Sequence, residues 1–323
     1  MRSDIGKTPT HPRHRLDCGN PHRPHTIRTS AGPRRVGIAG TVSVLLAANA
    51  DERRYSGLPT MQKHPLPEGA PGAARPPVVV TGAGSGLGRA TALALARRST
   101  PLLLVGRDTS RLLATQRACM ETGLAATACH VHAADITTPG EADRIVSRAI
   151  DALGSIGGLV NNAAVAKFGA LDATDEDDWS TTFETNFFAA ARLMRAAIPA
   201  LRETRGMIVN IGSIGGLLAM PGRSMYGASK AALMHFTRSM ARELAPDIRV
   251  NAIIPGAIET EIYGTLGMDE QTLHAFKQSL VSTTPMGRMG TTEDISPWIE
   301  LLFSDGGRWV TGSLIVIDGG RAC

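Results

Sequence analysis

Aromatic residues are scarce in this chain, and their scarcity argues against one class of function. Phe, Trp and Tyr together make up only 4% of the 323 residues, whereas 35 residues are glycine. Proteins that hold single-stranded nucleic acid stack its bases on aromatic rings. A chain with few rings and many small residues favours tight backbone packing instead, and we expect it to bind no nucleic acid.

Cysteine is also rare, with only Cys18, Cys119, Cys129 and Cys323 present. No two of them have the spacing of metal ligands, and four are too few for a disulfide scaffold of this length. His130 and His132 alternate in one apolar segment without a third ligand nearby, so we predict no metal site. Reduced thiols are typical of cytosolic proteins, and we expect a cytoplasmic location.

A positive charge excess is missing from most of the chain, although the net charge is +5. Residues 1–60 contain ten Lys or Arg and four Asp or Glu, whereas the remainder contains 24 basic and 25 acidic residues. The basic excess therefore belongs to the N-terminal segment. The rest of the chain has no electrostatic reason to bind nucleic acid.

Residues 1–75 lack the periodicity of secondary structure and are rich in Pro, Arg, His and Gly, so we predict a disordered basic tail. Its one apolar run, Val36 to Ala50, is similar to a signal peptide, but it starts deep in the chain and is too short to span a bilayer comfortably. We expect no membrane association. An alternative is that translation begins at Met61 and that the preceding residues are not part of the working protein.

Beyond residue 76 the sequence becomes regular, and we expect a catalytic domain over residues 76–323. Short apolar runs alternate with amphipathic segments, a pattern typical of a parallel sheet covered by helices on both faces. The expected strands are 78–80, 102–105, 126–133, 159–161, 207–211, 248–254 and 314–317. The expected helices are 86–98, 110–122, 140–153, 179–203, 224–244 and 292–303, with an insertion containing helical pieces over 259–284.

The first expected strand runs into a glycine-rich stretch, Thr81-Gly82-Ala83-Gly84-Ser85-Gly86-Leu87-Gly88, which leads directly into a helix. Glycine lets the backbone turn sharply and approach a phosphate, and the helix N-terminus offers free N–H groups to it. The position between a strand and a helix is the one that a dinucleotide-binding loop requires.

A second motif lies between Ser213 and Lys230. Tyr226 and Lys230 are four residues apart on an expected helix, so their side chains share one face. A positive charge beside a Tyr favours the phenolate, which makes the Tyr a usable acid or base. Ser213 follows an apolar run and supplies a hydroxyl that could hydrogen-bond a carbonyl oxygen.

Taken together, these motifs resemble the short-chain dehydrogenase/reductase family. The matching residues are Thr81-Gly82-x-x-x-Gly86-x-Gly88, Asn161-Asn162-Ala163-Ala164, Asn186, Ser213, Tyr226-x-x-x-Lys230 and Pro255-Gly256. The resemblance covers roughly Pro77 to Gly320, with one departure, since Ala164 stands where the family usually has glycine. It implies a three-layer Rossmann fold with a doubly wound, seven-stranded parallel sheet of order 3-2-1-4-5-6-7. It also implies a homotetramer formed through helices 179–203 and 224–244.

The resemblance further implies four catalytic residues. Tyr226 would act as the general acid or base, and Lys230 would lower the pKa of Tyr226 and hold the ribose of the cofactor. Ser213 would hydrogen-bond the substrate oxygen, where a fixed donor stabilises the transition state most. Asn186 would hold a water that links Lys230 to solvent. The alternative for Asn186 is a buried amide bonded to the backbone.

The same resemblance implies the residues that bind the dinucleotide. Asp135 and Ile136 would lie near the adenine ring, and the loop after the sixth strand would meet the nicotinamide. The full set is Thr81, Gly82, Ser85, Gly86, Leu87, Gly88, Arg107, Asp135, Ile136, Asn162, Ala163, Tyr226, Lys230, Pro255, Gly256, Ile258 and Thr260.

The end of the second strand bears on the choice of cofactor. Relatives that use NAD carry an acid where this chain has Gly106, and the next residue, Arg107, suits the 2′-phosphate of NADP. These residues favour NADP(H). NAD(H) stays open because of Asp108, which could point to solvent, cap the following helix or reach the ribose.

The sequence thus predicts an oxidoreductase that interconverts a secondary alcohol and a ketone. Pro285-Met286-Gly287-Arg288 and Asp318-Gly319-Gly320 resemble bacterial enzymes that reduce 3-oxoacyl thioesters. Apolar residues in the 259–284 insertion would cover the substrate, which favours a small, apolar carbonyl or alcohol compound. The alternative is a non-catalytic, redox-sensing regulator that binds a dinucleotide, and the complete set of four catalytic residues argues against it.

Overall fold

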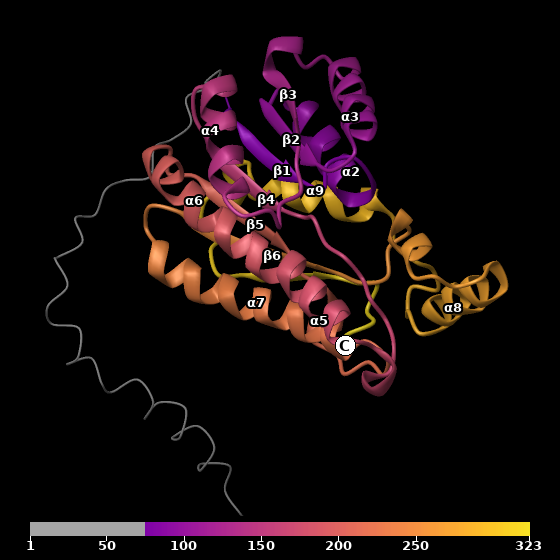
Figure 1. Cartoon of the computed structure of the whole chain (residues 1–323). Helices are drawn as coiled ribbons and strands as arrows, with labels where there is room; N and C mark the ends of the chain where they lie inside the picture. The colour runs from indigo at the N-terminus through magenta and orange to yellow at the C-terminus, as the bar shows by residue number, and fades with distance from the viewer. Residues whose placement is uncertain (1–74) are drawn as a thin grey trace, which may run out of the picture. The chain divides into compact units, whose positions relative to one another are not determined.

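Seven short segments of the chain form one parallel β-sheet in the computed structural model, which describes residues 75–323 (Figure 1). The strands are β1 (Val78–Thr81), β2 (Leu102–Gly106), β3 (Cys129–Ala133), β4 (Gly158–Asn161), β5 (Met207–Ile211), β6 (Arg249–Pro255) and β7 (Leu314–Ile317). Their order is β3-β2-β1-β4-β5-β6-β7, and each neighbouring pair is parallel. The predicted doubly wound, seven-stranded sheet is confirmed.

Helices cover both faces of this sheet (Figure 1). α2 (Gly86–Ala96), α3 (Thr109–Glu121) and α9 (Thr292–Leu302) lie on one face, and α4 (Glu141–Leu153), α6 (Ala189–Glu203) and α7 (Ser224–Leu244) on the other. Successive residues of a strand point to opposite faces. Accordingly, Val78 and Val80 pack into the first of the two cores and Val79 into the second, which gives the three layers of a Rossmann fold.

The expected long helix over residues 179–203 differs in two respects. It begins earlier, as α5 (Glu176–Phe183), because the Asp175 carboxylate accepts a hydrogen bond from the backbone N–H of Asp178 and caps it. Between α5 and α6 the backbone also widens into one π-helical turn, Glu184–Phe188. Such turns are rare and often mark functional sites, and this one contains Asn186.

The third strand is shorter than expected, and the 259–284 insertion extends away from the sheet. The third strand begins only at Cys129, because Ala126–Ala128 forms a 3₁₀ turn. The insertion over 259–284 does contain helical pieces, a 3₁₀ turn at Glu261–Thr265 and α8 (Glu270–Ser282). α8 projects beyond the three layers (Figure 1), and Leu280 is its one buried residue.

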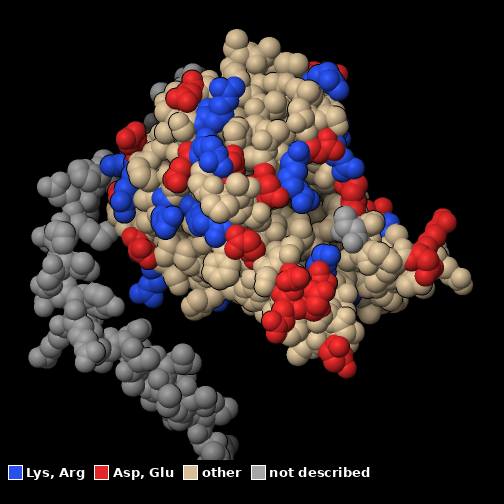
Figure 2. Space-filling model, in the orientation of Figure 1, with Lys and Arg blue, Asp and Glu red and all other residues tan. Residues whose placement is uncertain are grey.

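The predicted tail over residues 1–75, with its apolar run and Met61, lies outside the described residues apart from Arg75. Among the residues that the structure does describe, no helix has the length and hydrophobicity to cross a membrane. The face drawn in Figure 2 mixes both signs of charge, and acidic side chains gather over the start of α5. Cys119 and Cys129 are buried free thiols.

Candidate active site

A cavity of about 720 Å³ lies at the carboxyl ends of the strands. The strand order reverses between β1 and β4, and a doubly wound sheet opens a crevice at that point. The cavity is lined by the glycine-rich loop, the ends of β2, β4 and β5, the first turns of α7 and the segment after β6. Its volume is typical of a cofactor and small-molecule site.

The glycine-rich loop forms one end of the cavity. Gly82 has a φ of +63°, a conformation that other residues rarely adopt. A Cβ on Gly88 would collide with the carbonyl oxygen of Gly82 and the amide of Asn162. The loop therefore folds back tightly on the first turn of α2, which presents backbone N–H groups to the cavity and fits a pyrophosphate.

Thr81 supports this loop from beneath. Its buried hydroxyl donates to the Val160 carbonyl oxygen at 3.2 Å and accepts from the backbone N–H groups of Asn162 and Ala163 at 3.0 and 3.1 Å. The Asn162 amide donates in turn to the Thr81 carbonyl oxygen at 2.9 Å. Thr81 and Gly88 do not line the cavity, so these two predicted cofactor-binding residues shape it indirectly.

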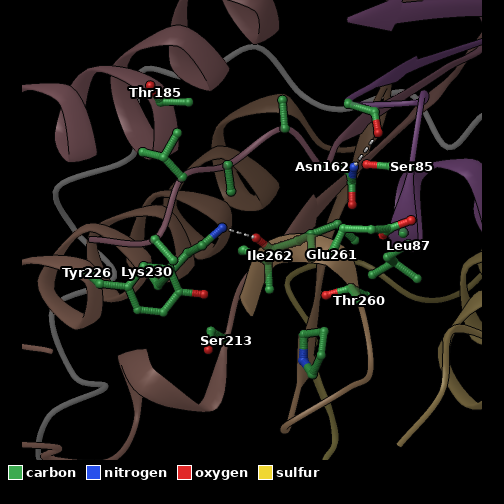
Figure 3. A pocket seen from close by; sticks show the side chains of 18 of the residues that line it. Ser85, Leu87, Asn162, Thr185, Ser213, Tyr226, Lys230, Thr260, Glu261 and Ile262 are labelled. Carbon is green, nitrogen blue, oxygen red and sulfur yellow. Dashed lines mark hydrogen bonds between the residues drawn. The ribbon is translucent and has the colours of Figure 1, made fainter. Parts of the chain in front are cut away.

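The structure brings the other predicted cofactor-binding residues together around the cavity. They are Gly82, Ser85, Gly86, Leu87, Arg107, Asp135, Ile136, Asn162, Ala163, Tyr226, Lys230, Pro255, Gly256, Ile258 and Thr260. Ser85, Leu87 and Asn162 lie at one side of the close-up view, Tyr226 and Lys230 at the other, and Thr260 between them (Figure 3).

At the end of β2, Gly106, Arg107 and Asp108 line the cavity, and Asp108 also caps α3. The Asp108 carboxylate accepts from the Ser110 hydroxyl at 2.6 Å and from the Arg111 backbone N–H at 3.1 Å. These hydrogen bonds lower the pKa of Asp108. Of the three possibilities for Asp108, the helix cap is observed, and its place in the cavity lining leaves a contact with the ribose open.

Tyr226, Ser213 and Lys230 converge on one part of the cavity (Figure 3). Lys230 is 3% exposed, and its Nζ donates to the carbonyl oxygen of Ile211, the last residue of β5, at 2.8 Å. Burial lowers the pKa of Lys230 to about 8. Burial also raises the pKa of Tyr226, while the nearby Ser213 hydroxyl and the Arg223 charge oppose that rise.

The predicted lowering of the Tyr226 pKa by Lys230 is therefore wrong for this structure. The Lys230 ammonium is directed to the Ile211 carbonyl oxygen, and the same burial that destabilises its charge destabilises a phenolate. The two side chains are nevertheless one turn apart on α7, as their spacing requires.

Asn186 lies outside the cavity lining and is 1% exposed. Its Oδ1 accepts from the Val165 N–H at 2.9 Å, and its Nδ2 donates to the Val165 carbonyl oxygen at 3.0 Å and to the Ser229 hydroxyl at 3.1 Å. The side chain is thus a buried amide bonded largely to backbone. It ties the loop after β4 to α7, next to Lys230.

Residues 82–322 match the family described as enoyl-(acyl carrier protein) reductase. The chain belongs to the short-chain dehydrogenase/reductase family. It is an NAD(P)-dependent oxidoreductase with the Rossmann fold of that family.

Similar members of this family come from several bacteria. An uncharacterized oxidoreductase of Mycobacterium tuberculosis is 35% identical over 75% of this chain and 90% of its own length. 2-(S)-Hydroxypropyl-CoM dehydrogenase 3 of Xanthobacter autotrophicus is 32% identical over 75% and 95%. 3-Oxoacyl-[acyl-carrier-protein] reductase of Thermotoga maritima is 32% identical over 75% and 96%.

Solved structures agree with this assignment. A short-chain dehydrogenase/reductase of unknown function from Caenorhabditis elegans, crystallised with cofactor, superposes with a TM-score of 0.72 at 31% identity. That match covers 77% of this chain and 95% of the other. Levodione reductase superposes with a TM-score of 0.73 at 29% identity, over 77% and 98%.

The end of the cavity around Tyr226 contains side chains that the motifs did not predict. Phe168, Arg223, Tyr263 and Arg321 line the cavity, and Phe276 of α8 packs on three of them. They come from four separate segments of the chain. Tyr263 and Phe276 belong to the 259–284 insertion that the sequence placed over the substrate, and Arg223 precedes Tyr226 by three residues and so lies one helical turn away. Phe168 and Arg321 had no signal in the sequence.

Proposed function

We propose that this enzyme interconverts a secondary alcohol and a ketone, with NADP(H) as the hydride carrier and Tyr226 as general acid or base. The observation that carries the proposal is the convergence of Tyr226, Ser213 and buried Lys230 on one end of a cavity whose other end is the glycine-rich loop (Figure 3). Two relatives, the hydroxypropyl-CoM dehydrogenase and the 3-oxoacyl-[acyl-carrier-protein] reductase, support this reaction class by their names.

Each polar group has a distinct part in the proposed reaction. The bound dinucleotide supplies or accepts the hydride. Ser213 donates a hydrogen bond to the substrate oxygen and steadies the charge that develops there. Tyr226 delivers a proton to that oxygen during reduction and removes it during oxidation. Lys230 offers donors for the cofactor ribose, and Asn186 holds the loop after β4 against α7.

The preference for NADP(H) rests on the end of β2. Gly106 places no carboxylate there, and Arg107 offers a planar donor for a 2′-phosphate. Asp108, the carboxylate next to Arg107 in the sequence that could serve NAD(H), is hydrogen-bonded by Ser110 and Arg111 as a helix cap. In this proposal, the positive charge of Arg107 therefore influences the choice between NADP(H) and NAD(H) more than the Asp108 carboxylate does.

We also propose that the enzyme is cytoplasmic and that residues 76–323 form its catalytic unit. Family resemblance favours a homotetramer built through α5, α6 and α7. Phe188, which joins α5 to α6 and is 46% exposed, suits such an interface. The substrate is proposed to be a small carbonyl or alcohol compound, because apolar side chains such as Met220, Ile262 and Leu266 form part of the cavity wall.

Steady-state oxidation of NADPH by the full chain, measured against a panel of ketones, tests the proposal. Tyr226→Phe should reduce turnover by about 10²- to 10⁴-fold, the usual contribution of a general acid, and leave NADPH binding nearly intact. Tyr263→Phe removes the other phenolic hydroxyl that lines the cavity and should cost less than about tenfold, because that group is not proposed to transfer a proton. An equal loss in both variants, or an active Tyr226→Phe protein, would refute the role of Tyr226.

A further inference from the structure

Arg223 is a cation at the substrate end that the proposed reaction does not use. Its guanidinium carbon lies 4.9 Å from the ring centroid of Phe168 and 5.0 Å from that of Phe276. One amino group donates to the Met220 thioether at 3.4 Å, a weak acceptor. Within residues 75–323, no carboxylate lies within ion-pair distance of this guanidinium.

The other charged groups around the cavity have partners or lie elsewhere. Lys167 pairs with Asp178 at 3.1 Å, and Lys230 donates to the Ile211 carbonyl oxygen. Of the two glutamates that line the cavity, Glu184 pairs with Arg192, and the Glu261 carboxylate lies against Gly86 in the glycine-rich loop. Burial raises the pKa of Tyr263, and Glu259 is close enough to that phenol to add to the rise, but no carboxylate among the described residues forms an ion pair with Arg223.

A second cation makes the same end more positive. Arg321 lines the cavity near the C-terminus, and its charge lowers the pKa of Arg223, as burial does more strongly. The neighbouring carboxylate, Asp318, is engaged by the backbone N–H groups of Gly320 and Ala322 at 2.9 and 2.6 Å. Asp318 thus holds the backbone turn that carries Arg321 and forms no ion pair with either arginine.

Two half-buried arginines without an anion are unfavourable in the absence of a ligand, because burial removes water from the charge. The two aromatic rings hold the Arg223 guanidinium in place, and its N–H edges have only one weak acceptor. A fixed, planar guanidinium is the group that matches a carboxylate, sulfonate or phosphate with two parallel hydrogen bonds.

We propose that the substrate is an anionic ketone or alcohol, and that Arg223 binds its terminal oxyanion with Arg321 as a second positive charge. The carbonyl end lies between Ser213 and Tyr226, and the apolar walls around Phe168 and Tyr263 enclose the carbon chain between the two ends. This inference rests on the proposed function and narrows its substrate class from small carbonyl or alcohol compounds to those that carry an oxyanion, a short oxo acid in the simplest case.

Matched pairs of substrates that differ only in charge test the proposal. 4-Oxopentanoate and 5-oxohexanoate are compared with their neutral amides, using the full chain and NADPH. Wild-type kcat/KM should favour at least one acid over its amide by about tenfold to a hundredfold, the range expected for a charge-assisted hydrogen bond. Arg223→Gln should abolish that preference by slowing the acid alone, and Arg223→Lys should keep part of it, because the charge remains but the planar donor is lost.

Controls separate binding from folding and from general charge. Lys277→Gln removes a nearby cation that belongs to α8, lies 5.9 Å from the Tyr263 ring centroid and does not line the cavity. It should leave the acid-to-amide ratio unchanged. A thermal melt checks that each variant is folded. Replacing the carboxylate of the best acid by sulfonate or phosphate distinguishes the oxyanions, and a preference for any of the three over the amide supports the proposal.

A second readout does not depend on turnover. The dissociation constant of 4-oxopentanoate for the full chain with NADP⁺ should rise about tenfold or more in Arg223→Gln. If no ketone is reduced, the proposed reaction fails, and this titration alone still decides the anion site. Equal kcat/KM for acids and amides in the wild type, or equal affinity of wild type and Arg223→Gln, would overturn the proposal and leave Arg223 a packing residue between two rings.

Discussion

The two ends of the cavity differ in whether backbone or side-chain atoms form them. The phosphate-binding part of the cofactor end is mainly backbone: a strand, a turn with glycines and the first turn of a helix, all within residues 78–96. The substrate end is mainly side chains, contributed by the loop after β4, by α7, by the segment after β6 and by the C-terminal turn. A backbone site tolerates little change at a few glycines, whereas a side-chain site is free to change its specificity without altering the fold.

Gly88→Ala is expected to have the largest effect, because it would break the cofactor end. The added methyl group would meet the Gly82 carbonyl oxygen and the Asn162 amide, and neither can move without shifting the loop or β4. Affinity for NADPH should fall by roughly a hundredfold or more, or the domain should lose several degrees of thermal stability. Fluorescence titration with NADPH and a thermal melt measure the two outcomes.

Gly264→Ala is the matched change at the substrate end. A Cβ at Gly264 meets nothing within 4 Å, so this variant should bind NADPH as the wild type does. Unchanged NADPH affinity and stability in Gly88→Ala would mean that the loop is looser than its contacts indicate. The cofactor end would then tolerate an added methyl group as well as the substrate end does.

The same contrast explains how much the sequence predicted. The order of the strands and the glycine-rich loop were predictable, because apolar runs and glycines determine local backbone conformation. The start of α5 was missed because the cap at Asp175 precedes the first apolar residue. The π-helical turn at Asn186 depends on hydrogen bonds to Val165 and Ser229, which lie far away in the sequence.

The substrate end could not be predicted in the same way. Arg223, Phe168 and Phe276 meet only after the sheet and α8 have placed three segments together. No periodic pattern links residues 168, 223 and 276, so the cation between two rings has no local signature. The raised pKa of Tyr226 was missed for a related reason, since it follows from burial and not from the spacing to Lys230.

Lys230→Met should have the next largest effect, in opposite directions on function and stability. Lowering the pKa of Lys230 from 10.5 to about 8 costs up to about 3 kcal/mol when the group is charged, at roughly 1.4 kcal/mol per pH unit. Below about pH 8 the native state carries this cost in full. Between pH 8 and 10.5 the unfolded chain binds more protons, so the stability of the wild type rises with pH.

The Lys230→Met protein should therefore melt a few degrees higher than the wild type at pH 7. That gain should shrink as the pH approaches 10. Turnover should be nearly lost and NADPH affinity weakened, because the ribose donor is gone. Melting curves at pH 7, 8.5 and 10 measure the trend, and a Lys230→Met protein that melts lower at pH 7 would show that the hydrogen bond to Ile211 outweighs the burial of the charge.

The smallest expected effect concerns the choice between NADPH and NADH. At the end of β2, side chains and not the backbone determine which cofactor binds. The wild type should prefer NADPH over NADH by at least about tenfold in kcat/KM, the contribution of one charge-assisted hydrogen bond from Arg107. Gly106→Asp together with Arg107→Ala should reverse the preference. The new carboxylate accepts from the ribose hydroxyls and repels a phosphate, and its Cβ first meets Leu112 at 3.4 Å, an ordinary contact.

Asp108→Ala should lower stability through the lost cap without changing the ratio of kcat/KM for NADPH and NADH. A wild type that prefers NADH, with the preference lost in Asp108→Ala, would assign the ribose to Asp108 and reject the role of Arg107.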